Sequence, residues 1–228
     1  MVLVPDDAGC GWRSTTGPVE LCLAERPGPA YDLAMSPALK PPDVMTTTEF
    51  LAWDAPDGRL WQLLDGQPAA MAPPSRTHGA IQSQLGYMIA AHLDVPGNPC
   101  SVVTTPGIVP RVRAAENFRI PDLAVTCTRY ETEEYDVSNP VLIVEILSPS
   151  NRAETWQNVW SFTTIPSLRE ILILSSTEIR AELLRRDGEG AWPAIATVIE
   201  ADDLVLDSIG MTVPLATVYR TTRLAAGL

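Results

Sequence analysis

The sequence predicts an α/β or α+β domain built around one mixed β-sheet, and three observations support this prediction. Helical and strand patterns follow one another in the order helix, strands, helix, strands, helix. Residues 141–147 form a short apolar run rich in β-branched side chains, which is typical of a strand buried on both faces. The chain of 228 residues shows no internal repeat and is long enough for one sizeable domain with a complete core.

The first 44 residues are expected to lie outside this domain. They are rich in Pro and Gly, and they show neither helical nor alternating apolar periodicity. They also lack the basic region followed by an apolar core that defines a signal peptide. Met35 and Met45 each offer a start for a shorter product. We therefore interpret residues 1–44 as an N-terminal extension, poorly ordered or not translated in full, and residues 45–228 as the folded domain.

A short helix and a hairpin are the first elements expected in this domain. Thr46 and Glu49 form a capping-box pattern, which marks the start of a helix. Residues 58–71 then predict two strands joined by a turn at Asp65-Gly66.

An amphipathic helix is expected over residues 77–93. Its buried face carries apolar side chains at helical spacing, namely Ile81, Leu85, Met88 and Ile89. His92 lies at the far end of this face, and we interpret it as a core histidine. His78, in the first turn, also faces the sheet. Either His78 orients a metal-bound water or contacts a phosphate, or it is a helix-start residue satisfied by local backbone.

The second half of the chain predicts the remaining strands and two more helices. Strands are expected over residues 102–104, 107–112, 122–126, 141–147 and 194–199, and residues 169–176 and 177–186 are expected to pair as a hairpin. A helix is expected over residues 152–162, where Trp156, Val159 and Trp160 form an apolar stripe suited to core packing. A short helix with Pro214 in its first turn closes the domain.

The charge balance restricts how this protein can meet nucleic acid. A net charge of −12 argues against binding by bulk attraction, because phosphate binding is driven by Lys and Arg. The basic residues are nearly all Arg, which suits bidentate phosphate contacts in a local groove. No uninterrupted apolar stretch approaches membrane-spanning length, so no membrane partner is expected.

The cysteine content indicates a cytoplasmic location. None of the spacings between cysteines matches those that zinc sites use. We interpret all four as reduced thiols, although an even count also allows a disulfide. They are Cys10, Cys22, Cys100 and Cys127.

Two carboxylates are the strongest candidates for a functional site. Glu145 lies inside the apolar run 141–147, where an ionised carboxylate is costly unless a cation meets it, and the single lysine, Lys40, is far away in sequence. Asp122 opens another apolar strand after Pro121. If these strands are neighbours, the two carboxylates converge at one edge of the sheet. With a nearby backbone carbonyl they would bind Mg²⁺ or Mn²⁺, because these cations prefer oxygen ligands.

A structural role is the alternative for each carboxylate. Glu145 would then form an ion pair with an arginine, for instance Arg119 or Arg152. Asp122 would be a turn residue, which is common for Asp after Pro.

The chain resembles the Uma-type putative restriction endonuclease family, which belongs to the PD-(D/E)XK nuclease superfamily. The resemblance covers residues 46–218 and rests on five segments in order: WQLLDGQ, PSRTH, RIPDLAV, PVLIVEILSPS and IPSLREILIL. It implies a restriction-endonuclease-like core, with a central mixed β-sheet flanked by α-helices. It also implies metal-dependent hydrolysis of DNA phosphodiester bonds and, because most such enzymes cut two strands as dimers, a homodimer.

The resemblance also assigns the site residues. It implies that Asp122 and Glu145 bind the metal and that His78 is the family's histidine. The superfamily lysine would stand two residues after Glu145, where this chain has Leu147. In the family the lysine has moved to the following helix, to the position of Asn158 in this chain.

Two further positions of that pattern fall on Glu154, one turn before Asn158, and on Gln62. Gln62 stands where the family has an acidic residue in its first strand. Two expected ionisable groups are therefore amides here. The candidate catalytic set is Asp122, Glu145, His78, Asn158 and Gln62.

We predict from this set a Mg²⁺- or Mn²⁺-dependent DNA endonuclease that is attenuated, because Asn158 donates a hydrogen bond but brings no positive charge. One alternative is a catalytically inactive DNA- or protein-binding module that retains the fold. Another is a metal-dependent hydrolase that acts on a different phosphoester.

Overall fold

The computed structural model describes residues 2–5, 12–15, 44–129, 134–149 and 152–225. The chain forms two compact units, residues 1–40 and 41–228, each described by itself. In the first unit, β1 (Val2–Pro5) pairs antiparallel with β2 (Trp12–Thr15). Most of the predicted N-terminal extension lies outside the described residues, so its boundary at residue 44 stays a prediction.

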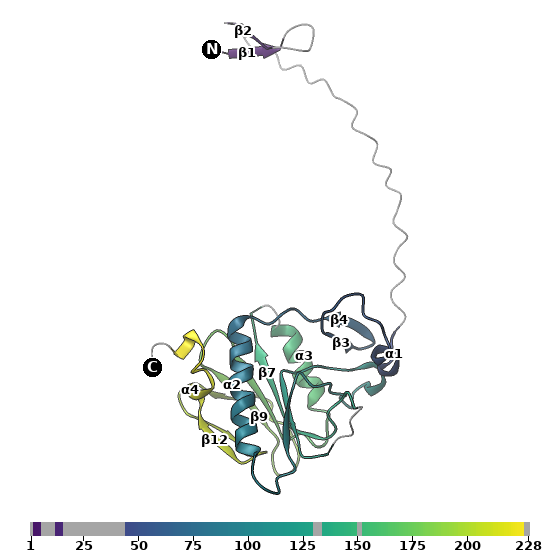
Figure 1. Ribbon diagram of the computed structural model, residues 1–228, viewed down its shortest axis with the longest axis vertical. Coiled ribbons are helices and arrows are strands. Elements are labelled where there is room, and N and C mark those ends of the chain that lie inside the picture. The colour runs from purple at the N-terminus through teal and green to yellow at the C-terminus, as the bar shows by residue number, and fades with distance from the viewer. Residues whose placement is uncertain (1, 6–11, 16–43, 130–133, 150–151, 226–228) are drawn as a thin grey trace. The chain divides into compact units, whose positions relative to one another are not determined.

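The second unit contains a six-stranded mixed sheet (Figure 1). The spatial order of its strands is β10-β9-β8-β7-β6-β5. Only β7 and β8 are parallel to each other, and every other neighbouring pair is antiparallel. The strands are β5 (Ser101–Thr104), β6 (Leu123–Thr126), β7 (Pro140–Leu147), β8 (Glu170–Ser175), β9 (Ala181–Arg185) and β10 (Thr197–Ile199). The prediction of one central mixed sheet is confirmed.

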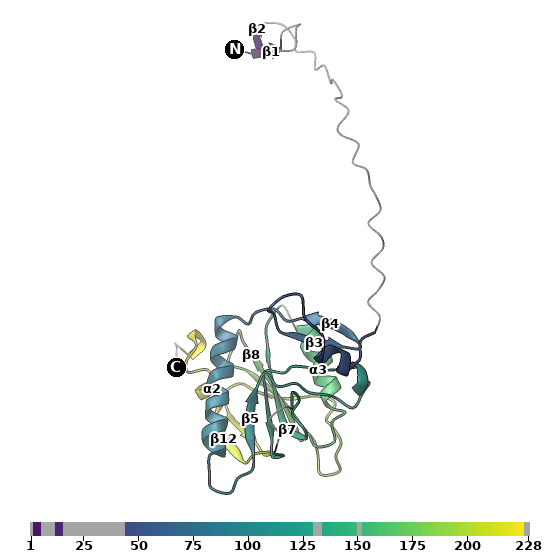
Figure 2. The same cartoon turned by 45° about the vertical axis from the view of Figure 1, so that its right-hand side comes forward.

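Helices cover both faces of this sheet (Figures 1 and 2). One face is covered by α2 (Arg76–Leu93) and α4 (Leu215–Val218), together with the hairpin of β11 (Asp203–Leu206) and β12 (Met211–Pro214). The other face is covered by α3 (Arg152–Phe162), which lies in the crossover that the parallel pair β7–β8 requires. Among the described residues, no helix is both long enough and apolar enough to cross a membrane.

The alternation of side chains along β7 divides the core into two layers. Leu142, Val144 and Ile146 belong to the cluster on the α2 side, with Ile81, Leu85 and Ile89 of α2. Ile143 and Leu147 belong to the cluster on the α3 side, with Val159 and Phe162 of α3. Successive residues of a strand point to opposite faces. Glu145 therefore points toward α3, between Ile143 and Leu147.

A third, smaller core lies under α1 (Thr47–Leu51) and the hairpin of β3 (Trp61–Leu64) and β4 (Gln67–Ala70). It contains Phe50, Leu63, Phe118 and Ile120. The predicted capping box is present, because the Thr46 and Glu49 side chains each accept from the other's backbone N–H. The Asp65-Gly66 turn has φ of 49° and 81°, as a type I′ hairpin requires.

The hairpin is attached to the segment that leads into β6. Leu63 and Phe118 exchange two backbone hydrogen bonds of 2.8 and 3.0 Å. This attachment places β3 beside residues 117–120. It also brings Gln62, the neighbour of Leu63, close to the sheet.

One expectation about secondary structure is wrong, and one hairpin was not predicted. Residues 107–112 form no strand and make only isolated bridges at Gly107 and Ile108. Pro106 and Pro110 lack the N–H groups that a continuous ladder would use. The sequence analysis also missed the β11–β12 hairpin. Short 3₁₀ helices occur at Ala114–Glu116 and Arg223–Ala225.

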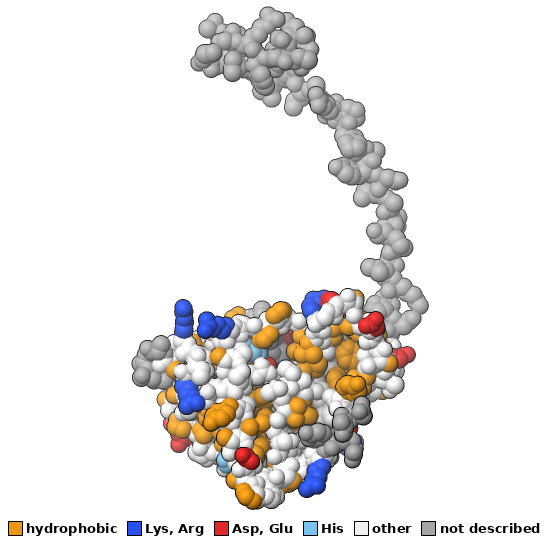
Figure 3. All heavy atoms as spheres, viewed as in Figure 1, with side chains coloured by type: hydrophobic (Ala, Val, Ile, Leu, Met, Phe, Trp, Pro, Cys, Tyr) orange, Lys and Arg blue, Asp and Glu red, His pale blue; other side chains and the backbone are white. Residues whose placement is uncertain are grey.

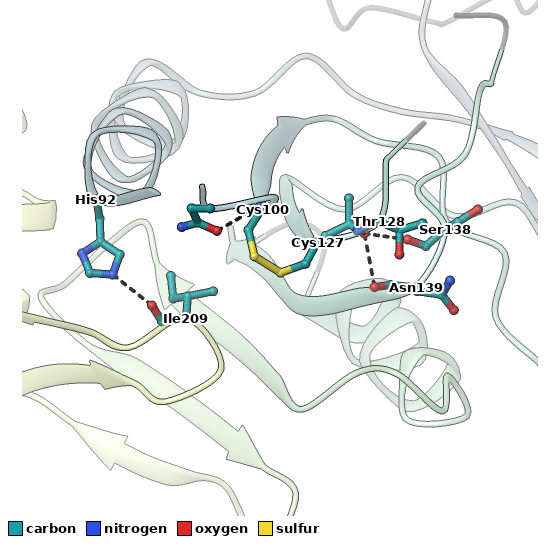
Figure 4. Close-up of a disulfide and its surroundings, with 9 residues drawn as sticks. His92, Cys100, Cys127, Thr128, Ser138, Asn139 and Ile209 are labelled. Carbon is teal, nitrogen blue, oxygen red and sulfur yellow. Dashed lines mark hydrogen bonds between the residues drawn. A yellow bond between two sulfur atoms is a disulfide. The ribbon is translucent and has the colours of Figure 1, made fainter. Parts of the chain in front are cut away.

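His92 is not a core histidine, because its side chain is exposed. Its ring Nε2 lies 2.9 Å from the carbonyl oxygen of Ile209, in the turn between β11 and β12 (Figure 4). The end of α2 thus faces the hairpin that the sequence analysis missed, and this explains the wrong interpretation.

A disulfide joins Cys100 and Cys127 (Figure 4), so the prediction of four reduced thiols is wrong for this pair. Ser101 pairs with Thr126 in the β5–β6 ladder, and this register places the two cysteines opposite each other. The bond ties the edge strand β5 to the strand that follows Asp122. Cys10 and Cys22 lie outside the described residues.

We expect the double substitution Cys100→Ser/Cys127→Ser to lower the free energy of unfolding by about 3 kcal/mol, because loss of the cross-link frees the unfolded chain. Chemical denaturation with and without dithiothreitol measures this difference. The reductant should destabilise the parent protein and leave the double variant unchanged. A parent protein that is equally stable in both buffers would contradict the bond.

Gly107→Ala should lower the free energy of unfolding by about 1–3 kcal/mol, because an added methyl group overpacks this position. The new Cβ would overlap the Phe118 ring and lie 2.6 Å from the Tyr135 carbonyl oxygen. Gly79→Ala is the matched control, since nothing lies within 4 Å of its added Cβ. In helix α2 that change should stabilise by about 1 kcal/mol. Urea unfolding of both variants checks the pair, and equal stabilities would contradict the close contact.

Candidate active site

The register of two strands brings Asp122 and Glu145 together. Leu123 of β6 pairs with Val144 of antiparallel β7, so Asp122 stands opposite Glu145 at the start of β6. The Asp122 Oδ2 atom accepts a hydrogen bond of 2.7 Å from the backbone N–H of Ile146. The two carboxylates therefore meet where β6 begins and β7 approaches its end.

His78 also reaches this point from the first turn of α2. Ser75 caps the helix by accepting from the His78 backbone N–H at 3.2 Å. The His78 ring Nε2 lies 2.6 Å from Asp122 Oδ1. Because an ionised carboxylate only accepts, Nε2 carries the proton and donates. The ring therefore contacts the site, and local backbone does not satisfy its Nε2.

Glu145 is only 6 % exposed and forms no salt bridge with any described residue. The predicted alternative, a direct ion pair with Arg119 or Arg152, does not form, although the Arg119 charge acts on Glu145 from a greater distance. The hydrogen-bond partner of Glu145 among the described residues is the Asn158 amide, whose Nδ2 donates to Glu145 Oε1 over 3.5 Å. Burial and, next, the Asp122 carboxylate raise the pKa of Glu145 well above its usual range. An additional positive charge would fit this position.

Helix α3 supplies the wall opposite Glu145. Asn158 and Glu154 lie one turn apart on the same face of the helix. Gln62 of β3 donates from Nε2 to Glu154 Oε1 at 2.5 Å. The Gln62 Oε1 atom is buried and has no hydrogen-bond partner among the described residues. Hydrogen bonds thus place the five residues predicted from the sequence in three groups: His78 with Asp122, Asn158 with Glu145, and Gln62 with Glu154.

Arg119, expected from the sequence only as a possible ion-pair partner of Glu145, is a further residue of the site. Arg119 is 5 % exposed, and its Nη1 donates to Asn158 Oδ1 at 2.7 Å. Its Nε and Nη2 donate to Asn117 Oδ1 at 3.0 and 2.8 Å. Asn117 and Arg119 alternate with the buried Phe118 and Ile120, a pattern that places two polar side chains on one face. This alternation in the sequence could have predicted Arg119 as a site residue.

The residues present fit a hard divalent cation. The site offers the Asp122 and Glu145 carboxylates and the orphaned Gln62 carbonyl oxygen, all of which are oxygen donors. Among the described residues, no group of three or more His, Cys, Asp and Glu side chains is placed to hold a metal. Mg²⁺ needs only one or two carboxylates, because water and substrate oxygens complete its octahedron. A closed zinc site would require more protein ligands.

The surface shows no strong basic region on the face seen in Figure 3. On the described part of that face, the few Lys and Arg side chains lie around the margin, two of them side by side at the upper left. Hydrophobic side chains gather over α1 and the β3–β4 hairpin, where Leu51 and Leu60 are exposed. Attraction of a polyanion would therefore depend on local contacts, in agreement with the net charge of −12.

A six-stranded mixed sheet with helices on both faces places the chain in the α/β class. Residues 47–216 match the Uma2 family, described as "Putative restriction endonuclease". The chain belongs to this family.

Two similar proteins extend over nearly the same region. The uncharacterized protein slr1290 of Synechocystis sp. is 29 % identical over 190 residues, which span 82 % of this chain and 97 % of that protein. The crystal structure of a putative nuclease belonging to DUF820, from Anabaena variabilis, superposes with a TM-score of 0.62. That match covers 77 % of this chain and 97 % of the other at 17 % identity, and it shows the shared fold.

Glu145→Gln should stabilise the protein when no divalent cation is present. The pKa of Glu145 is higher in the folded protein than in the unfolded chain, where it lies near the usual value of 4.5, so the fold favours the protonated carboxyl. The stability that this preference contributes is complete below the unfolded pKa. It is lost as the pH rises through the folded pKa, because the buried carboxyl then ionises. The parent should therefore lose stability relative to the variant over that window. Thermal unfolding in EDTA from about pH 4 to pH 8 measures the difference.

The control for this comparison is Glu189→Gln, which changes an exposed glutamate between β9 and β10. Its pH profile should match that of the parent. Added Mg²⁺ should raise the Tm of the parent at neutral pH and leave that of Glu145→Gln unchanged. A Glu145→Gln protein that is less stable than the parent throughout would indicate a structural carboxylate.

Proposed function

We propose that this protein is a divalent-metal-dependent DNA endonuclease that hydrolyses phosphodiester bonds. One observation carries the proposal: Glu145 is buried opposite Asp122 and has no cationic partner within salt-bridge distance among the described residues. A buried carboxylate pair of this kind destabilises the protein unless a cation binds. Membership of the restriction endonuclease family supports the same reading.

Asp122 and Glu145 would hold Mg²⁺ or Mn²⁺ in this enzyme. When bound, such a cation lowers the pKa of a water ligand and offsets charge on a phosphate. The Asp122 carboxylate is held on both oxygens, by His78 Nε2 and by the Ile146 backbone N–H. These two hydrogen bonds fix its orientation before any ligand arrives, which is the preorganisation that catalysis needs.

His78, Gln62 and Asn158 would act on the water and the substrate. The His78 ring orients Asp122 through its Nε2–H. The orphaned Oε1 of Gln62 is a free acceptor for a water hydrogen. The Asn158 Nδ2 amide donates into the site and would contact the scissile phosphate.

We propose that the reaction is slow. Asn158 contributes a neutral donor, and loss of one electrostatic donor typically lowers an enzymatic rate by about 10²–10³. The DNA would be held by local arginine contacts, since the net charge is −12. A homodimer acting on both strands completes the proposal, whereas the cytoplasmic location expected from reduced thiols loses that support because Cys100 and Cys127 are joined. A catalytically inactive binding module is the second candidate, because amides occupy positions 62 and 158.

Plasmid nicking by the full-length protein tests this function. With Mg²⁺ or Mn²⁺ the parent should nick supercoiled DNA, and EDTA should abolish the reaction. Asp122→Ala and Glu145→Ala should each reduce the rate at least about 10³-fold, because each removes a metal ligand. Glu189→Ala, an exposed substitution, should leave the rate unchanged. A folded parent that cuts in neither metal would favour the inactive binding module.

A further inference from the structure

We infer that Arg119 is a positioning residue of this active site, which fixes the direction of the Asn158 amide and brings the positive charge that the site otherwise lacks. The inference rests on the proposed hydrolysis of a phosphodiester and goes further, because it names the cation that compensates for the neutral side chain at position 158.

The hydrogen bonding of Arg119 is unusual for a buried guanidinium. Its three contacts go to the side-chain oxygens of two neutral amides, Asn117 and Asn158. It forms no salt bridge with any described residue. A buried charge is costly unless it is hydrogen-bonded and paired. Because no described carboxylate pairs with Arg119 directly, its positive charge attracts negative groups from beyond salt-bridge distance.

Three carboxylates act on that charge, and none of them lies within salt-bridge distance of it. Burial lowers the pKa of Arg119, whereas Asp65, Glu154 and Glu145 raise it. Arginine nevertheless remains charged in proteins. Two of these carboxylates, Glu145 and Glu154, belong to the site. The guanidinium thus stands behind the site as a fixed positive charge in a medium that screens it weakly.

Arg119 dictates which end of the Asn158 amide enters the site. A guanidinium has donors only, so Asn158 must turn its Oδ1 toward Arg119. The Nδ2 group is then forced toward Glu145 and the region where a phosphate would lie. Without Arg119 the amide could rotate and present an oxygen to the anionic substrate, which would be repulsive.

The backbone keeps this cation in place. Asn117 is fully buried, and its Oδ1 also accepts from the Asp65 backbone N–H at 3.1 Å. Phe118, between Asn117 and Arg119, is fastened to Leu63 of β3 by two backbone hydrogen bonds. Because these two anchors hold the guanidinium in place, it does not have to move when negative charge develops on a phosphate in the transition state. A positive charge that is already in position stabilises that transition state most.

A purely structural role for Arg119, holding the segment around Asn117, is the competing explanation. The two roles differ in what a lysine at position 158 would do. A new ammonium there would restore charge to a site that lost Arg119, but it would not restore the contacts to Asn117. Rescue of the rate by that lysine therefore separates the two roles.

The experiment is single-turnover cleavage of supercoiled plasmid by full-length proteins with saturating Mg²⁺. Arg119→Gln should lower the rate about 10²-fold with little change in DNA affinity, because charge stabilisation in the transition state is lost. Arg119→Lys keeps the charge and should lose less. Arg119→Gln/Asn158→Lys should recover most of the lost rate. Asn158→Lys alone should gain little, since its ammonium would lie against the guanidinium.

The matched control is Arg186→Gln. The Arg186 guanidinium also donates to neutral oxygens, the backbone carbonyls of Thr163, Ile165 and Pro166, which follow the end of α3. Its loss should lower the Tm and leave the cleavage rate of the folded protein unchanged. Thermal unfolding of every variant is recorded with the rates.

Each outcome decides the inference. A folded Arg119→Gln protein that cuts as fast as the parent overturns it, and so does a loss that the added lysine fails to rescue. If Arg119→Gln does not fold, Arg119→Lys decides instead, because it keeps the positive charge and leaves Asn158 unchanged. Its rate should stay within about tenfold of the parent rate, and a folded Arg119→Lys protein that loses about 10²-fold overturns the inference. A parent that does not cut overturns the proposed function and the inference together, whereas the other failures leave the proposed function intact.

Discussion

The antiparallel register between β6 and β7 is the constraint on which the candidate site depends. It places Asp122 opposite Glu145, and the alternation along β7 turns Glu145 toward α3. A slip of one residue would exchange the faces, sending Glu145 into the aliphatic layer beneath α2 and turning Val144 toward α3. The apolar residues on both sides of β7 therefore specify the position of the charged residue between them.

The two carboxylates differ in how strongly their neighbours bind them. Asp122 accepts short hydrogen bonds from the His78 ring of α2 and from the Ile146 backbone N–H of β7. Among the residues that the structure describes, Glu145 receives only the long contact from Asn158. One carboxylate is thus rigidly held and the other is left electrostatically unsatisfied. This asymmetry suits a site that recruits a cation, because the unsatisfied group drives binding while the fixed group sets geometry.

Local patterns predicted most of the fold and part of the site. The capping box at Thr46, the Asp65-Gly66 turn and the helix over residues 152–162 depend on neighbouring residues, and each was found where expected. The disulfide, the exposed position of His92 and the contact of Arg119 with Asn158 depend on which strands and hairpins meet in space. No periodicity in a single sequence reports such meetings, so these features required the structure.

The wide sequence separation of the site contacts has a consequence for biosynthesis. Gln62 and Glu154 are 92 positions apart, His78 and Asp122 are 44 apart, and Arg119 and Asn158 are 39 apart. Contacts of such high contact order form late, after the cost of closing long loops has been met. An emerging chain on the ribosome cannot assemble the cluster until α3 has been synthesised. The candidate site can therefore be complete only after the chain has been synthesised through α3.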